Sequence, residues 1–128
     1  MKLLLDTHAF LWFIAGNPRL SQTCRALIED DANEKLVSIA GITEIAIKSS
    51  LGKLLLERPF AELIPQQLLQ NDFHLHPLSL ETAVCLSKLP FHHRDPFDRM
   101  MAAQCLVENL PVLSSDEIFD AYGVRRIW

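Results

Sequence analysis

The chain has 128 residues, of which 49% are hydrophobic, and this length and composition suit one domain, residues 1–128, with a single core. No apolar run approaches the roughly 20 residues of a membrane helix, and the first residues do not have the pattern of a signal peptide. A net charge of −4 speaks against a nucleic-acid partner. This argument is weak, since cations bound to an acidic cluster would make that site positively charged. The three cysteines are scattered through predicted helices, which favours free buried thiols in a reducing, cytoplasmic setting.

The chain opens with a continuous apolar run, residues 3–5, that ends abruptly at Asp6. Because a half-exposed strand would alternate apolar and polar residues, this run predicts a strand covered on both faces, as in a parallel α/β sheet. Thr7 is a suitable cap for an apolar helix over residues 9–14. We therefore expect a buried strand with a carboxylate at its tip, at the edge where open α/β sheets bind ligands.

Strands and helices alternate along the rest of the chain. Further short strands are predicted at residues 35–39, 73–78, 110–114 and 124–128, the last at an edge of the sheet. Helices are predicted at residues 21–30, from Gly41 to a stop at Gly52, after Pro59, at residues 79–89 and after the pair Asp95-Pro96. This alternation predicts right-handed βαβ crossovers, and so a three-layer α/β/α fold with a mostly parallel sheet of about five strands.

Four of the 16 acidic residues stand at junctions on one predicted edge of this sheet. Asp6 ends the first strand, and Glu44 lies in the first turn of the helix after the second. Asp98 lies in the first turn of the helix opened at Asp95, and Asp116 follows the fourth strand by two residues. Since the carboxyl ends of parallel strands point the same way, we expect these carboxylates to converge. Their repulsion then requires divalent cations, and an oxygen-only ligand set suits Mg²⁺ or Mn²⁺, as in phosphodiester hydrolysis.

The junction acids also have a purely structural interpretation. Acids in the first turn stabilise the helix dipole, and Glu44 and Asp98 suit such positions as well as they suit a metal site. Asp6 is harder to explain in this way, since an aspartate at the tip of a buried strand gains nothing from packing. His92 and His93 are candidate ligands, but adjacent residues do not converge on one ion, which favours a solvated loop for both.

Three basic residues lie near the predicted acidic edge: Lys48, Arg94 and Arg99. Their side chains are candidates for contacts to the phosphates of a nucleic-acid substrate. The structural alternative is surface charge, or pairing with the acids themselves. The sequence does not decide between these interpretations.

Four stretches together resemble a PIN-domain protein, and in particular the VapC-type toxins of bacterial type II toxin–antitoxin systems. They are Asp-Thr-His at 6–8, residues 41–53, His-Arg-Asp-Pro-Phe-Asp-Arg at 93–99 and Leu-Ser-Ser-Asp at 113–116. The Asp-Pro-Phe-Asp-Arg run, followed by an apolar helix, is the most specific of them. The resemblance implies a five-stranded, mostly parallel sheet between helices. It also implies a metal-dependent ribonuclease, with RNA as substrate and a small cognate antitoxin as inhibitor.

Carried over by position, the resemblance assigns roles to six residues. The catalytic, metal-binding acids would be Asp6, Glu44, Asp98 and Asp116, with Asp95 as an accessory acid and Ser114 as the hydroxyl before the last aspartate. The metal would be Mg²⁺, with Mn²⁺ as an alternative. Gly41 and Thr43 stand where close relatives tend to have serine and tryptophan. This departure bears on local substrate contacts more than on catalysis.

Other classes of protein remain as alternatives. A phosphoaspartyl phosphatase needs a second acid two residues after Asp6, where this chain has His8, and a receiver domain needs an acidic pair ahead of a later aspartate. Both are disfavoured. A non-catalytic interaction module on a PIN-like scaffold is harder to exclude. Apolar residues such as Trp12, Phe13 and Trp128 offer a surface for a homodimer or for an antitoxin segment, although core packing is the usual role of each.

Overall fold

A computed structural model describes residues 1–128 and confirms the predicted three-layer α/β architecture. The strands are β1 (Lys2–Leu5), β2 (Glu34–Ser38), β3 (Phe73–His76), β4 (Val112–Leu113) and β5 (Arg126–Ile127). The helices are α1 (Thr7–Ala15), α2 (Gln22–Glu29), α3 (Ile39–Ser50), α4 (Phe60–Gln70), α5 (Leu80–Lys88), α6 (Pro96–Glu108) and α7 (Ile118–Ala121). All strand pairs are parallel, in the order β3-β2-β1-β4-β5, so β1 is central and β5 lies at an edge as predicted.

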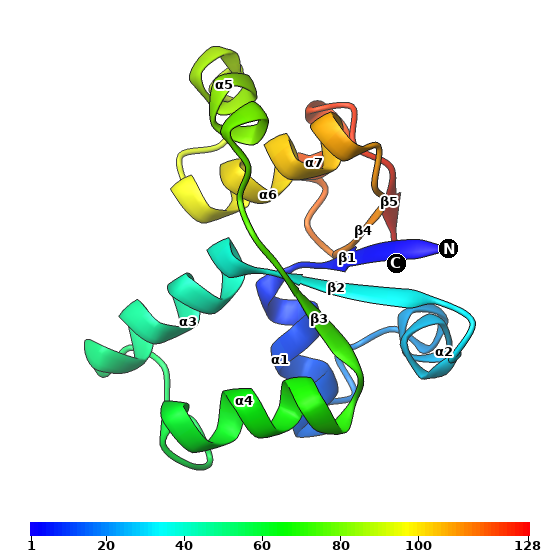
Figure 1. Ribbon diagram of the computed structural model, residues 1–128, viewed down its shortest axis with the longest axis vertical. Helices are drawn as coiled ribbons and strands as arrows, with labels where there is room; N and C mark the ends of the chain where they lie inside the picture. Colours follow the sequence, from blue (N-terminus) through cyan, green and yellow to red (C-terminus); the bar gives the residue numbers. More distant parts are fainter.

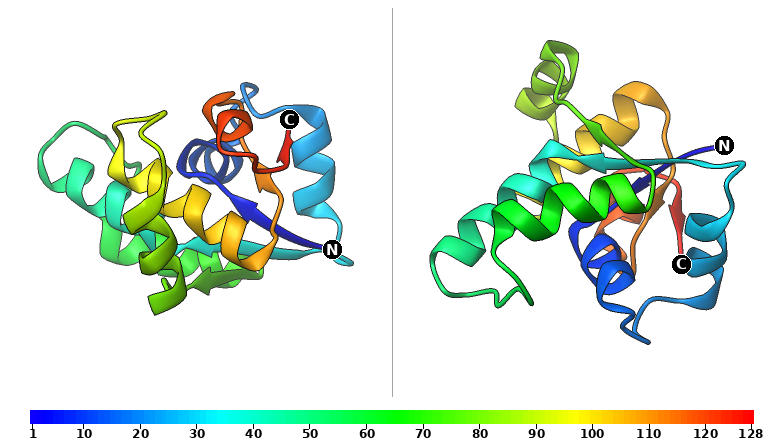
Figure 2. Two further views of the ribbon diagram at one scale, coloured as in Figure 1. Left: turned by 90° about the horizontal axis from the view of Figure 1, so that it is seen from above. Right: turned by 60° about the horizontal axis from the view of Figure 1, so that its bottom comes forward.

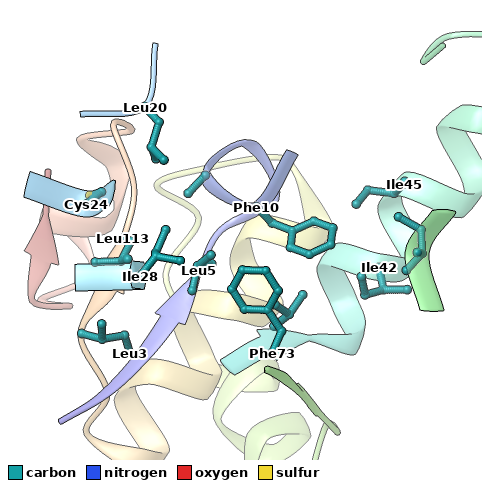
Figure 3. Close-up of a cluster of buried hydrophobic side chains, with 13 residues drawn as sticks. Leu3, Leu5, Phe10, Leu20, Cys24, Ile28, Ile42, Ile45, Phe73 and Leu113 are labelled. Atoms are coloured by element: carbon teal, nitrogen blue, oxygen red, sulfur yellow. The ribbon is translucent and has the colours of Figure 1, made fainter. Parts of the chain in front are cut away.

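The apolar run of β1 is covered on both faces of the sheet, as its sequence predicts. Leu3 and Leu5 belong to one buried cluster, which Figure 3 shows and to which α1, α2, α3 and α4 contribute. Leu4 points to the other face and joins a second cluster, to which α6, α7 and the segments around β4 contribute. Figure 1 shows α1, α2 and α4 on one side of β1 and β2, with α5, α6 and α7 on the other. In both views of Figure 2, α5 lies beside α6.

Two helices begin earlier than the sequence predicts. Asp6, not Thr7, caps α1, because its Oδ1 accepts a hydrogen bond of 2.7 Å from the Ala9 amide. Ser38 caps α3 through its hydroxyl, which accepts from the Ala40 amide at 3.1 Å. The chain thus passes directly from β2 into α3, and Glu44 lies in the second turn of that helix rather than in its first.

The predicted start of α3 at Gly41 is wrong, since this residue lies inside the helix. A Cβ atom at Gly41 would stand 3.1 Å from Thr7 Oγ1, closer than side chains usually approach. The glycine therefore allows α3 to lie close against the beginning of α1. Residues 54–56 adopt no regular secondary structure.

The aromatic residues considered as an open surface pack mainly onto the core. Trp12, Phe13 and Trp128 are half-buried against the first cluster, and the Trp12 and Trp128 rings meet edge-on with centroids 5.8 Å apart. The three cysteines are free thiols, as predicted; Cys24 and Cys105 are buried, whereas Cys85 is only half-buried. None of the helices combines the length and the apolar content needed to cross a bilayer.

Candidate functional site

Asp6 and Asp116 follow the neighbouring strands β1 and β4, so both lie at the carboxyl edge of the sheet. Asp6 is buried, and its amide donates to the Leu113 carbonyl at 3.2 Å. Ser114 is fully buried between them: its hydroxyl oxygen accepts from the Asp116 amide at 3.0 Å and is also hydrogen-bonded to the Asp6 carboxylate. Ser114 therefore ties the two acids together. Asp116 remains exposed, and its Oδ1 accepts from the Ile118 amide at the start of α7.

Glu44 reaches the same edge from the second turn of α3 and is buried. Its Oε1 accepts a hydrogen bond of 2.7 Å from the Thr7 hydroxyl, and its Oε2 forms an ion pair with Lys48 one turn later. Thr7, which the sequence suggested as a helix cap, thus holds a candidate metal ligand instead. The ion pair also fixes where the Lys48 ammonium group lies. The hydrogen bond to Glu44 raises the pKa of Lys48 above its usual value.

Asp95 and Asp98 lie at the start of α6 and have different roles. Asp95 is the N-cap, and one of its oxygens accepts from the amides of Phe97 and Asp98 at 2.8 and 3.1 Å. Asp98 is mostly buried and takes no part in capping. The capping interpretation therefore applies to Asp95. It does not explain why an acidic residue stands at position 98.

The electrostatics show that the predicted acids lie close enough to repel one another. Burial raises the pKa of Asp98 from its ordinary 3.8 to about 7, and the charges of Asp95, Glu44, Asp6 and Asp116 act in the same direction. Burial likewise raises the pKa of Asp6, against the hydrogen bonds from Ser114 and Ala9. Lys48 is the nearby cation that pairs with the group, and it is bound to Glu44. The site therefore carries more negative charge than its own cations balance.

This excess of carboxylate oxygen fits the divalent cations expected from the sequence. The donor set of Asp6, Glu44, Asp98 and Asp116 contains oxygen only, which suits Mg²⁺ or Mn²⁺ better than the softer metals. A bound cation would offset both the burial and the repulsion that raise the pKa of Asp98. The residues present thus fit a metal centre of the predicted kind.

The basic residues predicted near the acids lie in three different environments. Lys48 is paired with Glu44, and Arg94 is exposed in the loop before α6. Arg99 is buried: its guanidinium donates to the carbonyls of Leu89 and Pro90 at 3.2 and 2.7 Å. The predicted phosphate contact of Arg99 is therefore replaced by a structural role, because its nitrogens already bind the loop that leads into α6.

His93 is the residue at this site that the sequence interpretation underrated. Its Nε2 lies 3.1 Å from Asp98 Oδ2 and 3.8 Å from Asp116 Oδ2. The reasoning that adjacent histidines diverge holds, since His92 is exposed and packs edge-on against the Tyr122 ring. The His93 side chain nevertheless lies next to Asp98 and Asp116, which that reasoning did not predict. The available signal was the position of His93, two residues before the helix cap Asp95.

A mostly apolar pocket of about 300 Å³ lies beside His8, which follows Asp6 and Thr7. Trp12 lines it from α1, and the irregular segment 54–57 closes the other side. Leu55 in this segment is 91% exposed, so an apolar side chain stands in solvent next to the pocket. The pocket contains none of the candidate metal ligands and is separate from the acidic site.

Comparison with known proteins agrees with this fold. A family model for the PIN domain matches residues 3–124, and the chain therefore belongs to the PIN domain family. PIN domains are generally nucleases that use divalent metals. Comparison with curated protein sequences gives no significant match.

Several solved structures share the fold over nearly the whole chain. FitAcB from Neisseria gonorrhoeae is 19% identical with a TM-score of 0.67, covering 98% of this chain and 96% of its own. VapBC2 from Rickettsia felis, bound to a DNA fragment from their promoter, is 13% identical with a TM-score of 0.66 and coverages of 99% and 98%. VapBC-1 from nontypeable Haemophilus influenzae is 13% identical with a TM-score of 0.70 and coverages of 99% and 97%. At these identities the likeness concerns the fold.

Proposed function

We propose that this protein is a Mg²⁺-dependent ribonuclease and the toxin of a type II toxin–antitoxin pair. The observation that carries the proposal is the group of acids at the carboxyl edge of the sheet, where burial and then the neighbouring carboxylates raise the pKa of Asp98 to about 7. Carboxylates that are both buried and close to one another are costly without a counter-ion and suit a cation site. Membership of the PIN domain family and the similarity to toxin–antitoxin complexes support the same proposal.

In this mechanism Asp6, Glu44, Asp98 and Asp116 would hold the metal, with Mn²⁺ as a substitute for Mg²⁺. When bound, the cation supplies Lewis-acid polarisation of the phosphodiester and a source of hydroxide at neutral pH. Thr7 and Lys48 fix the Glu44 carboxylate, and Ser114 fixes Asp6 and the Asp116 backbone. These contacts hold Glu44 and Asp6 in fixed orientations, and such preorganisation of charged groups is what phosphoryl transfer requires.

The proposed partners follow from the site and its surroundings. Arg94 is exposed beside Asp95 and is the basic residue best placed to meet RNA phosphates. A cognate antitoxin is the expected protein partner, and the apolar pocket beside His8, with the exposed Leu55, suits an apolar segment of such a protein. A homodimer, suggested by apolar residues such as Trp12, Phe13 and Trp128, stays a prediction.

RNA cleavage in cells tests the proposal whichever RNA is the target. The protein is expressed from an inducible promoter in a bacterium, and new RNA 5′ ends are mapped in total RNA. We expect new ends with the wild-type chain and none with Asp6→Asn, which keeps the shape of the side chain and removes its charge. Purified wild-type protein should cleave the mapped RNA with Mg²⁺ or Mn²⁺ and not with EDTA.

Two outcomes would contradict this assignment. Equal cleavage by Asp6→Asn and wild type would point to another nuclease in the preparation or another active site. A wild-type chain that is folded and produces no new ends would favour the alternative, a non-catalytic interaction module on the PIN fold.

A further inference from the structure

The imidazole of His93 stands within reach of two candidate metal ligands. Its Nε2, Asp98 and Asp116 offer three ligand atoms that all lie within 4.8 Å of one another. Distance alone would therefore make His93 a metal ligand together with the two aspartates. The other nitrogen of the ring decides against this interpretation.

The Nδ1 atom of His93 accepts a hydrogen bond from the Asp95 backbone amide at 3.2 Å. A backbone N–H is always a donor, so Nδ1 must present a lone pair. The proton of the neutral imidazole then resides on Nε2, the atom that faces Asp98 and Asp116. An Nε2–H group donates hydrogen bonds and has no lone pair for a metal.

The loop that carries His93 is also held in place by residues other than the acids. The His93 amide donates to the Tyr122 hydroxyl at 3.0 Å, and Arg99 donates to the same hydroxyl at 3.2 Å. Arg99 also binds two carbonyls of the preceding residues, Leu89 and Pro90. A change of tautomer would cost the bond from Asp95, because two N–H groups would then face each other.

We propose that His93 is a positioning residue of the metal site and not one of its ligands. Its Nε2–H donates to Oδ2 of Asp98 and holds that carboxylate toward Asp116, while the Asp95 amide fixes the tautomer. The inference rests on the proposed function, since it assigns how the metal-binding acids are oriented. Partners of this kind, hydrogen-bonded to a ligand rather than to the metal, change metal affinity when they are removed.

The tautomer is measured directly by long-range ¹H–¹⁵N NMR of the histidine side chains in the wild-type protein, at about pH 8.5, where imidazole is neutral. The His93 signal is identified by its loss in His93→Gln. We expect a proton on Nε2 and none on Nδ1, both before and after addition of Mg²⁺. A proton on Nδ1, or loss of the Nε2 proton when Mg²⁺ binds, would overturn the proposal.

Mn²⁺ affinity gives a second readout that does not depend on RNA cleavage. Glutamine places an amide N–H where Nε2–H stands, so His93→Gln should bind Mn²⁺ within about threefold of wild type, whereas His93→Leu should bind roughly tenfold more weakly. The matched control His92→Gln should behave as wild type, and thermal unfolding verifies that each variant is folded. Equal affinity of the Leu and Gln variants would contradict the proposal.

These measurements separate the proposal from the proposed function. The first tautomer measurement needs neither metal nor RNA, so it tests the contact with Asp98 even if the protein cleaves nothing. A wild-type chain that binds no Mn²⁺ would refute the metal site, and with it the role of His93. A protein that binds Mn²⁺ and follows the expected pattern without cleaving RNA would leave the role of His93 intact and refute the ribonuclease.

Discussion

Asp98→Asn is expected to abolish RNA cleavage, by a factor on the order of 10³ or more, and to stabilise the metal-free protein. The loss of activity follows from the loss of a charged metal ligand. The gain in stability follows from the metal-free site, where Asp98 is mostly buried among Asp95, Glu44, Asp6 and Asp116. An amide of the same shape removes one charge from this cluster while it can still accept a hydrogen bond from His93.

The sign of the pH dependence is set by the raised pKa of Asp98. In the unfolded chain this carboxyl titrates near its ordinary 3.8, and in the folded, metal-free protein near 7. Between these values the folded protein holds more protons, so the free energy of unfolding falls as the pH rises from about 4 to about 7. The contribution is on the order of 2 kcal/mol, less than the full shift implies because solvent screens part of it.

Thermal unfolding in EDTA across this pH range measures the effect. At pH 8 we expect Asp98→Asn to melt higher than wild type by roughly 5–10 °C, with the two curves meeting near pH 4. Addition of Mg²⁺ should reverse the order at pH 8, because only the wild-type site binds the cation tightly. A variant that is less stable than wild type in EDTA at pH 8 would show that the carboxylates do not repel one another as described.

Arg99→Ala is expected to destabilise the protein by about 3 kcal/mol, the largest stability loss among these variants. Arg99 is 6% exposed, and its guanidinium binds the carbonyls of Leu89 and Pro90 and the Tyr122 hydroxyl. It also lies over the Phe91 ring, 4.0 Å from its centroid. Lysine should not rescue the loss, since one ammonium group cannot serve this planar set of partners.

Urea unfolding of Arg99→Ala, Arg99→Lys and the control Arg94→Ala measures this effect. Arg94 belongs to the same loop and is exposed, so its variant should unfold at the wild-type urea concentration. The two Arg99 variants should unfold at clearly lower concentrations. Equal stability of Arg99→Ala and Arg94→Ala would refute the structural role assigned to Arg99.

The parts of this structure that could be predicted from sequence are those governed by local patterns. The leucine run of residues 3–5 predicts a strand covered on both faces, and it is the central strand. The positions of Asp6, Asp98 and Asp116 after strands or at a helix start predict convergence, because parallel strands share a carboxyl edge. The Asp95-Pro96 pair marks the start of α6 correctly.

The parts that could not be predicted depend on contacts between distant segments. Thr7 binds Glu44 across 37 positions of the chain, and Arg99 binds a hydroxyl at Tyr122, so neither role has a local signature. His93 returns to the acids because Asp95 and Tyr122 hold its loop. The early start of α3 had a usable signal, since Ser38 is a favoured N-cap residue and a better candidate than Gly41.

The most direct test of the account is the binding of Mn²⁺ to the protein in the absence of RNA. Isothermal titration calorimetry compares wild type with Asp6→Asn, Glu44→Gln, Asp98→Asn and Asp116→Asn, with Glu62→Gln on the exposed face of α4 as a control. We expect saturable binding by wild type and by the control, and affinity weakened at least about tenfold in each of the four variants. Four variants that bind Mn²⁺ as tightly as wild type would contradict the claim that these carboxylates form one metal centre.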